Sequence, residues 1–271
     1  MLSSLAVFSW VLKANRQLAS INSARNATDL IASNFLMSTF VPFNKIPNFD
    51  PRAVPIKAWD AHLPAVQREQ LNAAALKARF AMPPAWEAEV REEPPFTDRA
   101  PREAAVLVAL IMRSESEGGP TLLLTQRTDT LSTHSGQIAF AGGKVDAGET
   151  AAQAALREAH EEVGLASPFV TVLGNLPRYT TGTAFHITPV VALVQPGFEL
   201  QANPAEVADV FEVPLAFLMN PAHHARHEFE FQGFQREWFS MPWLDAQTGQ
   251  ERFIWGATAG MLRNLYRFLS A

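Results

Sequence analysis

Three glutamates in one short stretch, Glu158, Glu161 and Glu162, are the residues of this sequence best suited to bind a metal ion. If residues 150–163 form an α-helix, side chains three and four positions apart share a face, so these carboxylates project together. Like charges at this spacing repel one another, and a bound cation relieves the repulsion. Oxygen ligands of this kind suit Mg²⁺ or Mn²⁺. A solvated acidic helix face would show the same spacing, so the flanking residues must decide between the two interpretations.

The residues around the glutamates favour the metal site. Gly142-Gly143 permits a turn with exposed backbone, and Gly148 breaks the chain before the predicted helix. Glu149 precedes Arg157 by eight residues, and two helical turns bring this arginine back toward Glu149, where the pair can lock the loop onto the helix. Gly164 fits the position that ends the helix.

Residues 143–165 resemble the signature of the Nudix hydrolases. The matching positions, at the family's spacing, are Gly143, Glu149, Arg157-Glu158, Glu161-Glu162 and Gly164-Leu165. Ala159 is smaller than the aliphatic residue usual at its position, which we interpret as a packing detail. The resemblance implies an α+β protein with the Nudix fold, a mixed β-sheet sandwiched between helices, and metal-dependent hydrolysis of a diphosphate.

Residue by residue, the resemblance implies two groups of site residues. Glu158, Glu161 and Glu162 would bind Mg²⁺ or Mn²⁺ together with the carbonyl of Gly142, and Glu149 and Arg157 would hold the geometry of the loop and helix. A metal ion neutralises phosphate oxygens, positions the attacking water and stabilises the leaving phosphate.

The general base stays open at this point. Glu158 is one candidate, and Nudix enzymes also recruit a glutamate from outside the motif. Glu206 and Glu212 are the nearest candidates of that kind. Either could equally be a surface or strand-edge carboxylate.

A second motif narrows the substrate. Residues 123–143 resemble the element that precedes the Nudix motif in coenzyme A pyrophosphatases, and the matching residues are Leu123-Leu124-Thr125, Arg127, Gly136, Phe140 and Gly142-Gly143. Thr128, Ser132 and Ala141 depart from it, since Ser or Ala, Arg and Pro are usual there. Loss of the arginine removes a bidentate clamp for phosphate.

The second resemblance implies that Arg127, His134, Gly136 and Gly143 contact the substrate. We expect coenzyme A or an acyl-CoA as substrate, with adenosine 3′,5′-bisphosphate and 4′-phosphopantetheine or its acyl derivative as products. Two alternatives stay open. The protein could hydrolyse another nucleoside diphosphate derivative, such as a nucleotide sugar or a dinucleotide, or it could be a non-catalytic Nudix module that binds a nucleotide or a protein.

The elements that must position these residues are mainly strands. Apolar runs predict strands at residues 104–112, 121–127, 137–140, 170–173, 187–194 and 207–213. Helices are predicted at residues 65–80, 150–163 and 258–269, the last with Thr258 as N-cap. Strand runs with few helices predict α+β rather than a doubly wound parallel sheet. We interpret His223, His224 and His227 as a polar loop, and the aromatic patch Trp238, Phe239, Met241 and Trp243 as a pocket lining, buried core or subunit contact.

Composition excludes several classes of protein. The 271 residues are 48% hydrophobic and 18% charged, which is typical of a folded globular chain. A net charge of −5 argues against nucleic acid as the main partner. The absence of cysteine excludes disulfides, thiolate catalysis and cysteine-ligated zinc. Residues 5–12 are too few to cross a bilayer. We expect a cytoplasmic protein that acts on a small molecule, and the sequence leaves a homodimer open.

The chain divides, in our prediction, near residue 95. Residues 1–95 form an N-terminal extension and residues 96–271 the hydrolase domain. Residues 1–28 are basic and lack acidic residues, a composition that resembles a transit peptide. A poorly ordered tail would have the same composition. So would residues translated from a start codon upstream of the real one, for which Met37 is a candidate. Prolines at positions 42, 47, 51, 55 and 64 predict an extended segment.

Overall fold

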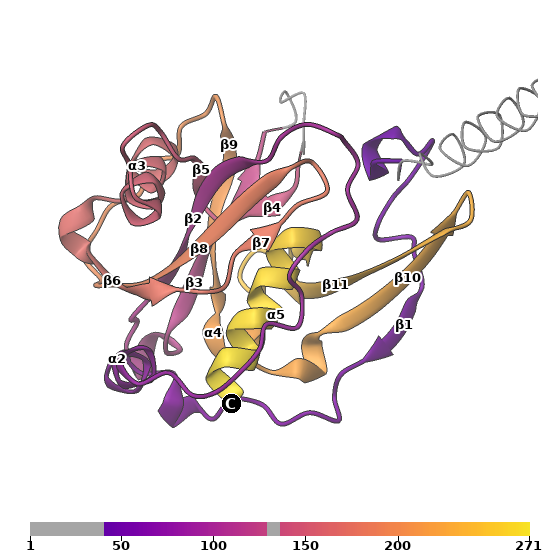
Figure 1. Cartoon of the computed structure of the whole chain (residues 1–271). Coiled ribbons are helices and arrows are strands. Elements are labelled where there is room, and N and C mark those ends of the chain that lie inside the picture. Colours follow the sequence, from indigo (N-terminus) through magenta and orange to yellow (C-terminus); the bar gives the residue numbers. More distant parts are fainter. Residues whose placement is uncertain (1–40, 129–135) are drawn as a thin grey trace, which may run out of the picture. The chain divides into compact units, whose positions relative to one another are not determined.

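The computed structural model describes residues 41–128 and 136–271 (Figure 1). The basic tail, and Ser132 and His134 of the second motif, lie outside the described residues. Pro42–Ala271 form one compact unit. Within the described part of the chain, no helix has both the length and the apolar character needed to span a membrane.

The larger sheet is mixed and carries the motif residues. Within the described residues it has eight strands, with the central order β4-β3-β2-β8-β6, while β5, β7 and β9 pair with β2, β8 and β3. Strand β2 runs parallel to β8 along its whole length and antiparallel to β5. The bounds are β2 (Arg102–Ile111), β3 (Thr121–Arg127), β4 (Ile138–Ala139), β5 (Gly142–Lys144), β6 (Val170–Asn175), β7 (Tyr179–Thr180), β8 (Phe185–Val194) and β9 (Val207–Pro214).

Alternate residues of β2 enter two different cores. Leu107 and Ala109 pack with α3 (Ala151–Val163) on one face of the sheet. Val108 and Leu110 join the core on the other face, which includes residues of the C-terminal helix α5 (Gly256–Ser270). Because both faces are covered, the strand is apolar at almost every position, which explains its uninterrupted run in the sequence. The predicted α+β architecture, a mixed sheet with helices on both faces, is confirmed.

A second, four-stranded antiparallel sheet was not expected from the sequence. Its order is β1-β10-β11-β12, with bounds β1 (Ile56–Trp59), β10 (Ala225–Phe231), β11 (Phe234–Leu244) and β12 (Glu251–Trp255). The interpretation of His223, His224 and His227 as a polar loop is wrong for two of them, because His224 and His227 are buried and His227 lies on β10. Of the aromatic patch on β11, Trp238, Phe239 and Met241 are buried.

The helices differ from expectation mainly at their ends. The helix predicted at residues 150–163 is present as α3, which begins at Ala151 with Thr150 as its N-cap. The segment 65–80 forms a 3-10 turn (Arg68–Gln70) and then α2 (Ala73–Ala81), because the side chain of Asn72 caps Ala75 and starts the helix late. The prediction of Thr258 as N-cap is wrong. Helix α5 begins at Gly256, and the hydroxyl of Thr258 instead donates to the carbonyl of Ile138. The remaining short helices are α4 (Leu215–Leu218) and the 3-10 turns Phe43–Lys45, Glu115–Glu117, Ser167–Phe169 and Pro221–His223.

Residues 42–95 pack in the same core as the rest of the unit. Val66, Leu71 and Leu76 are buried in the core that includes α5, and β1 pairs with β10. The division at residue 95 stays a prediction about domains, and it does not coincide with a break in packing.

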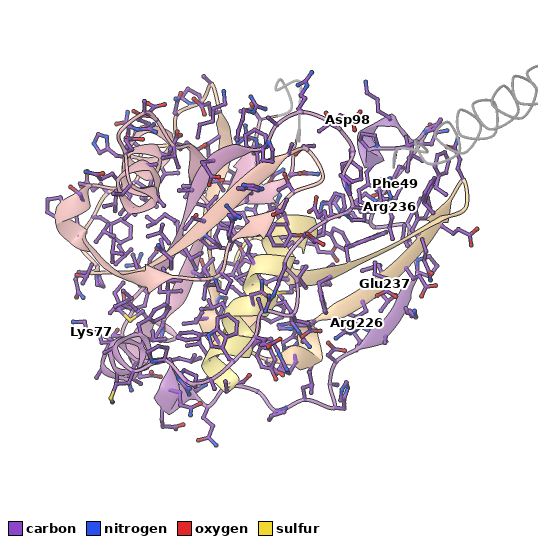
Figure 2. The ribbon with its side chains drawn as sticks, in the orientation of Figure 1. Phe49, Lys77, Asp98, Arg226, Arg236 and Glu237 are labelled. Carbon is purple, nitrogen blue, oxygen red and sulfur yellow. The ribbon has the colours of Figure 1, made fainter. Side chains whose placement is uncertain are left out.

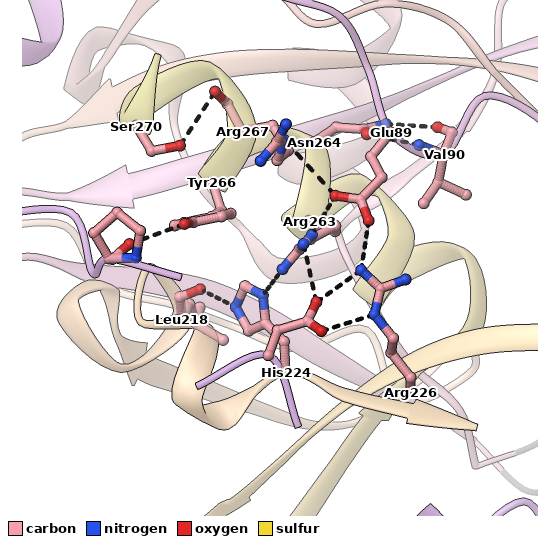
Figure 3. Close-up of polar contacts among 12 residues, drawn as sticks. Glu89, Val90, Leu218, His224, Arg226, Arg263, Asn264, Tyr266, Arg267 and Ser270 are labelled. Atoms are coloured by element: carbon pink, nitrogen blue, oxygen red, sulfur yellow. Dashed lines mark hydrogen bonds and ion pairs between the residues drawn. The ribbon is translucent and has the colours of Figure 1, made fainter. Parts of the chain in front are cut away.

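Buried charges also tie this segment to α5 (Figure 3). Arg263, which is 1% exposed, pairs with Asp60 at 2.9 Å and Glu89 at 2.7 Å. Arg226 of β10 bridges the same two carboxylates at 2.8 and 2.7 Å. In this cluster of four residues, buried Asp60 and Arg263 therefore each have partners of opposite sign, as a charge removed from water requires.

Candidate active site

Arg157 ties the loop after β5 to helix α3. Its Nε and Nη2 donate to the two carboxylate oxygens of Glu149 at 2.8 and 3.0 Å, and Nη2 also donates to the carbonyl of Lys144 at 3.0 Å. The amide of Asp146 donates to Glu149 at 3.0 Å. The paired hydrogen bonds from Arg157 hold the pKa of Glu149 at about 2. The predicted contact between Glu149 and Arg157 is present, and it fixes both ends of the glycine-containing loop.

The third nitrogen of this guanidinium reaches two of the predicted metal ligands. Nη1 of Arg157 donates to Glu158 at 2.9 Å and to Glu161 at 3.1 Å. The hydrogen bonds to Glu149, and next the one to Glu158, raise the pKa of Arg157. Because one nitrogen contacts both carboxylates, Glu158 and Glu161 lie beside each other, as the helical spacing predicted.

The two glycines of β5 are required by close approach. A Cβ atom on Gly143 would lie 2.3 Å from Oε1 of Glu158, so the carboxylate rests directly on the glycine. A Cβ on Gly142 would lie 2.4 Å from the carbonyl oxygen of Ala105 on the neighbouring strand β2. The amide of Gly142 donates to Oε2 of Glu162 at 3.1 Å. Both glycines therefore bring the α3 carboxylates against the strand.

Glu162 is a buried carboxylate with too little positive charge around it. Its side chain is 4% exposed, and the nearest guanidinium nitrogen, Nη1 of Arg127, lies 3.9 Å away. Burial raises the pKa of Glu162 to about 7, and the charges of Glu206 and Glu158 add to the effect. The Gly142 amide and Arg127 offset only part of it.

The oxygen atoms of Glu158, Glu161 and Glu162 are of the type that binds a hard divalent cation, although the three carboxylates do not converge on one point. In the described part of the chain, no three acidic or histidine side chains already form a metal-binding group. Arg157 holds two of the glutamates and the Gly142 amide holds the third. Carboxylate oxygens are the ligands that Mg²⁺ and Mn²⁺ prefer, and a cation would also offset the repulsion of buried Glu162 by Glu206 and Glu158.

Of the two outside candidates for the base, the structure brings only Glu206 to the site. The carbonyl of Glu206 accepts from Thr128 at 3.1 Å, and the amide of Asn203 in the same loop donates to the Glu162 carbonyl at 2.8 Å. Glu212 lies farther along β9, where it pairs with Arg113 and accepts from Thr121. Glu212 is therefore fully engaged elsewhere.

The predicted substrate contacts are described in part. Arg127 and Gly143 lie beside the α3 carboxylates. Gly136 is in a turn with φ of 67°, and the carbonyl of the next residue, Gln137, accepts from Arg127 at 3.0 Å. His134 lies outside the described residues. Sequence reasoning did not anticipate the approach of Arg127 to Glu162, because these residues are far apart in the chain and meet only where α3 packs on the face of the sheet to which Arg127 belongs.

Comparison with known proteins gives a consistent result. The model of the NUDIX domain matches residues 101–254. A relative from Cronobacter sakazakii, named "Uncharacterized Nudix hydrolase NudL", is 42% identical over 166 residues, which are 60% of this chain and 81% of that protein. A relative of the same name from Enterobacter sp. is 40% identical with the same coverage.

Solved structures resemble smaller parts of the chain. A Nudix hydrolase from M. smegmatis, RenU, is 28% identical with a TM-score of 0.38, and the match covers 48% of this chain and 80% of that one. A C. elegans Ap4A hydrolase in a binary complex is 23% identical with a TM-score of 0.36, and the match covers 41% and 80%.

Proposed function

The chain belongs to the Nudix family of hydrolases, which act on nucleoside diphosphate derivatives, and from that premise we propose that it cleaves the diphosphate of coenzyme A or an acyl-CoA. Water would attack phosphorus with the help of Mg²⁺ or Mn²⁺. The products would be adenosine 3′,5′-bisphosphate and 4′-phosphopantetheine or its acyl derivative.

The observation that carries the proposal is the state of Glu162. Its carboxylate is 4% exposed, accepts from the Gly142 amide, and has Arg127 no closer than 3.9 Å, while Glu158 lies against the neighbouring Gly143. A buried carboxylate next to a second one favours the binding of a cation over solvation of an acidic surface, and burial also raises the pKa of Glu162 to about 7. Glu158, Glu161 and Glu162, with the carbonyl of Gly142, would hold the metal ion. That ion supplies charge neutralisation of the phosphate oxygens and acidifies water.

The remaining residues would bind, orient and move a proton. Arg157 and Glu149 fix the helix against the loop, and Arg127 presents its guanidinium next to the carboxylates, where it can contact a phosphate oxygen. We propose Glu206 as the base that removes the proton from water. Its side chain forms no hydrogen bond or ion pair within the described residues, whereas Glu158 accepts from Arg157.

Support for coenzyme A as the substrate comes from residues 123–143. The motif implies that Arg127 contacts the substrate, and Arg127 lies 3.9 Å from the Glu162 carboxylate. Gly136 directly precedes Gln137, whose carbonyl accepts from the amide of Arg127. Two of the three departures from this motif, Thr128 and Ala141, lie in the described residues, and their local contacts are regular. Thr128 is buried with its amide bound to Glu206, and the carbonyl of Ala141 accepts from Leu107. A nucleotide sugar or a dinucleotide is the second candidate substrate.

One experiment separates these substrates. The full chain is incubated with Mg²⁺ or Mn²⁺ in ¹⁸O-water and with coenzyme A, ADP-ribose, NADH or a nucleoside triphosphate, and the products are identified by mass spectrometry. We expect the highest kcat/KM for coenzyme A and ¹⁸O in only one of its two products. A higher kcat/KM for any other compound would replace the coenzyme A proposal, and no hydrolysis of any compound would favour a non-catalytic binding module.

We also propose a cytoplasmic location and leave a homodimer to direct measurement. Cell fractionation tests the first, and light scattering of the purified full chain tests the second.

A further inference from the structure

Arg252 of β12 is a buried arginine that connects the two sheets. Its side chain is 4% exposed. Nη1 donates to Oε1 of Gln126 on β3 at 3.0 Å, and Nη2 pairs with Asp209 on β9. Its Cζ atom lies 4.2 Å from the centre of the Phe211 ring. One guanidinium from the small sheet therefore clamps two neighbouring strands of the large sheet.

The clamp lies on a β-bulge. Gln126 pairs with Asp209, but the next residue of β3, Arg127, pairs with Val207, so Ala208 is an extra residue on β9. The bulge reverses the side-chain alternation of β9. Val207 and Val210, three residues apart, both pack in the core with α3, which a regular strand would forbid.

The bulge determines which residues face the candidate active site. Arg127, directly after the clamped Gln126, points toward Glu162 of α3. Thr128, the next residue, donates its amide to the carbonyl of Glu206, directly before the bulged strand. The two side chains for which the proposed function requires a defined position, Arg127 and Glu206, are thus attached to the two strand ends that Arg252 joins from the opposite face.

We propose that Arg252 is a positioning residue: by bridging Gln126 and Asp209 it fixes the bulge that aims Arg127 and Glu206 at the α3 carboxylates. The inference rests on the proposed function of that site. It assigns to the small sheet, which contributes no carboxylate of the motif, a role in the reaction. A misplacement of about 1 Å in a catalytic group can lower a rate by about 100-fold, so a clamp of this kind has kinetic consequences.

The competing explanation is that Arg252 only stabilises the fold, and Arg236 provides the matched control for it. Arg236, on β11 of the same sheet and labelled in Figure 2, is 5% exposed. Its guanidinium lies over Phe43 and Phe96, at 4.6 and 4.7 Å from the ring centres, and both of these rings belong to segments other than β3 and β9. Both arginines are buried over aromatic rings, so Arg252→Gln and Arg236→Gln should both lower the melting temperature.

The test compares these two variants by kinetics and by hydrogen exchange, well below their melting temperatures. With coenzyme A and Mn²⁺, we expect Arg252→Gln to lower kcat by about tenfold or more with little change in KM, and Arg236→Gln to leave kcat within about twofold of wild type. Without substrate or metal, the amide of Thr128 should exchange faster in Arg252→Gln than in Arg236→Gln. Equal kcat in the two variants would overturn the inference, and so would unchanged exchange at Thr128.

A second variant covers the case in which Arg252→Gln does not fold. Asp209 is 44% exposed, so Asp209→Ala removes one arm of the clamp from a tolerant position. We expect a smaller fall in kcat and the same faster exchange at Thr128. If wild type hydrolyses none of the compounds, the proposed function fails, while the exchange measurement still decides whether Arg252 fixes the bulge.

Discussion

Arg157 and Glu149 form two parallel hydrogen bonds, 2.8 and 3.0 Å long, between the middle of α3 and the loop that precedes it. A pKa of about 2 for Glu149 means that this ion pair stays charged at every pH at which the protein would be assayed. The pair therefore holds the loop to α3 throughout this pH range and does not act as a pH switch.

Glu149→Gln should lower kcat by about 10- to 100-fold, because partners that orient ligands typically have effects of this size. The amide has only one oxygen to replace the two of the carboxylate, so one of the paired bonds between Glu149 and Arg157 is lost, while the bond from Arg157 to the Lys144 carbonyl remains. Arg157→Lys should not preserve activity, since an ammonium group cannot form the paired bonds. Steady-state kinetics measure both variants. Glu87→Gln, which removes an exposed partner of Arg91, is the control and should leave kcat unchanged. Full activity in Glu149→Gln would contradict the assigned role.

Adjacent glycines should respond differently to alanine. In Gly143→Ala the new Cβ meets the end of the Glu158 side chain, which can swing away. The fold should survive, and Mn²⁺ affinity should fall by about tenfold or more. In Gly142→Ala the Cβ meets backbone atoms of β2, so the free energy of unfolding should fall by about 1–3 kcal/mol. Chemical denaturation and calorimetric Mn²⁺ titration of both variants check this contrast. Equal Mn²⁺ affinity in Gly143→Ala and wild type would show that Glu158 is not a ligand.

Glu161→Gln should abolish most metal-dependent hydrolysis while leaving the fold intact. The Glu161 side chain is 55% exposed, so its replacement should change the free energy of unfolding by less than about 0.5 kcal/mol. Loss of a metal ligand removes several kcal/mol of transition-state stabilisation, which corresponds to a fall in rate of roughly 100-fold or more. Mn²⁺ should raise the melting temperature of wild type more than that of the variant. Glu199→Gln, at another exposed glutamate, is the control. An unaffected rate in Glu161→Gln would mean that the metal site has been misassigned.

The sequence was most informative where the signal is local. Thr150, Gly164 and the spacing of the glutamates lie within one helix and its caps, so composition and periodicity were sufficient to place α3. The four-stranded sheet was missed although charged and aromatic residues alternate in β10, as in Arg226 and His227, which is the pattern of a half-buried strand. The histidines at its start were interpreted as a polar loop instead.

Partners distant in sequence could not be predicted in the same way. The burial of His224 depends on Asp60, Glu89 and Arg263, which come from three other segments of the chain. The same holds for Arg252, whose partners on β3 and β9 are identified only by the register of the two sheets. Long-range electrostatic complementarity leaves no periodic trace in the sequence.

Buried His224 should make the stability of the protein depend on pH in mildly acidic solution. Burial lowers the pKa of His224 to about 4, and the neighbouring charge of Arg263 adds to the effect, while the Leu218 carbonyl and Asp60 oppose it (Figure 3). In the unfolded chain its pKa returns to about 6.5. Below that pH the unfolded state binds a proton that the folded state does not, so stability is complete above pH 6.5 and falls as the pH drops toward 4. At pH 5 this group lowers the free energy of unfolding by about 2 kcal/mol.

Urea denaturation at pH 7 and pH 5 tests this. The free energy of unfolding should differ less between the two pH values in His224→Gln than in wild type, even though the variant is less stable at both. An identical pH dependence in His224→Gln and wild type would mean that His224 is protonated in the folded state.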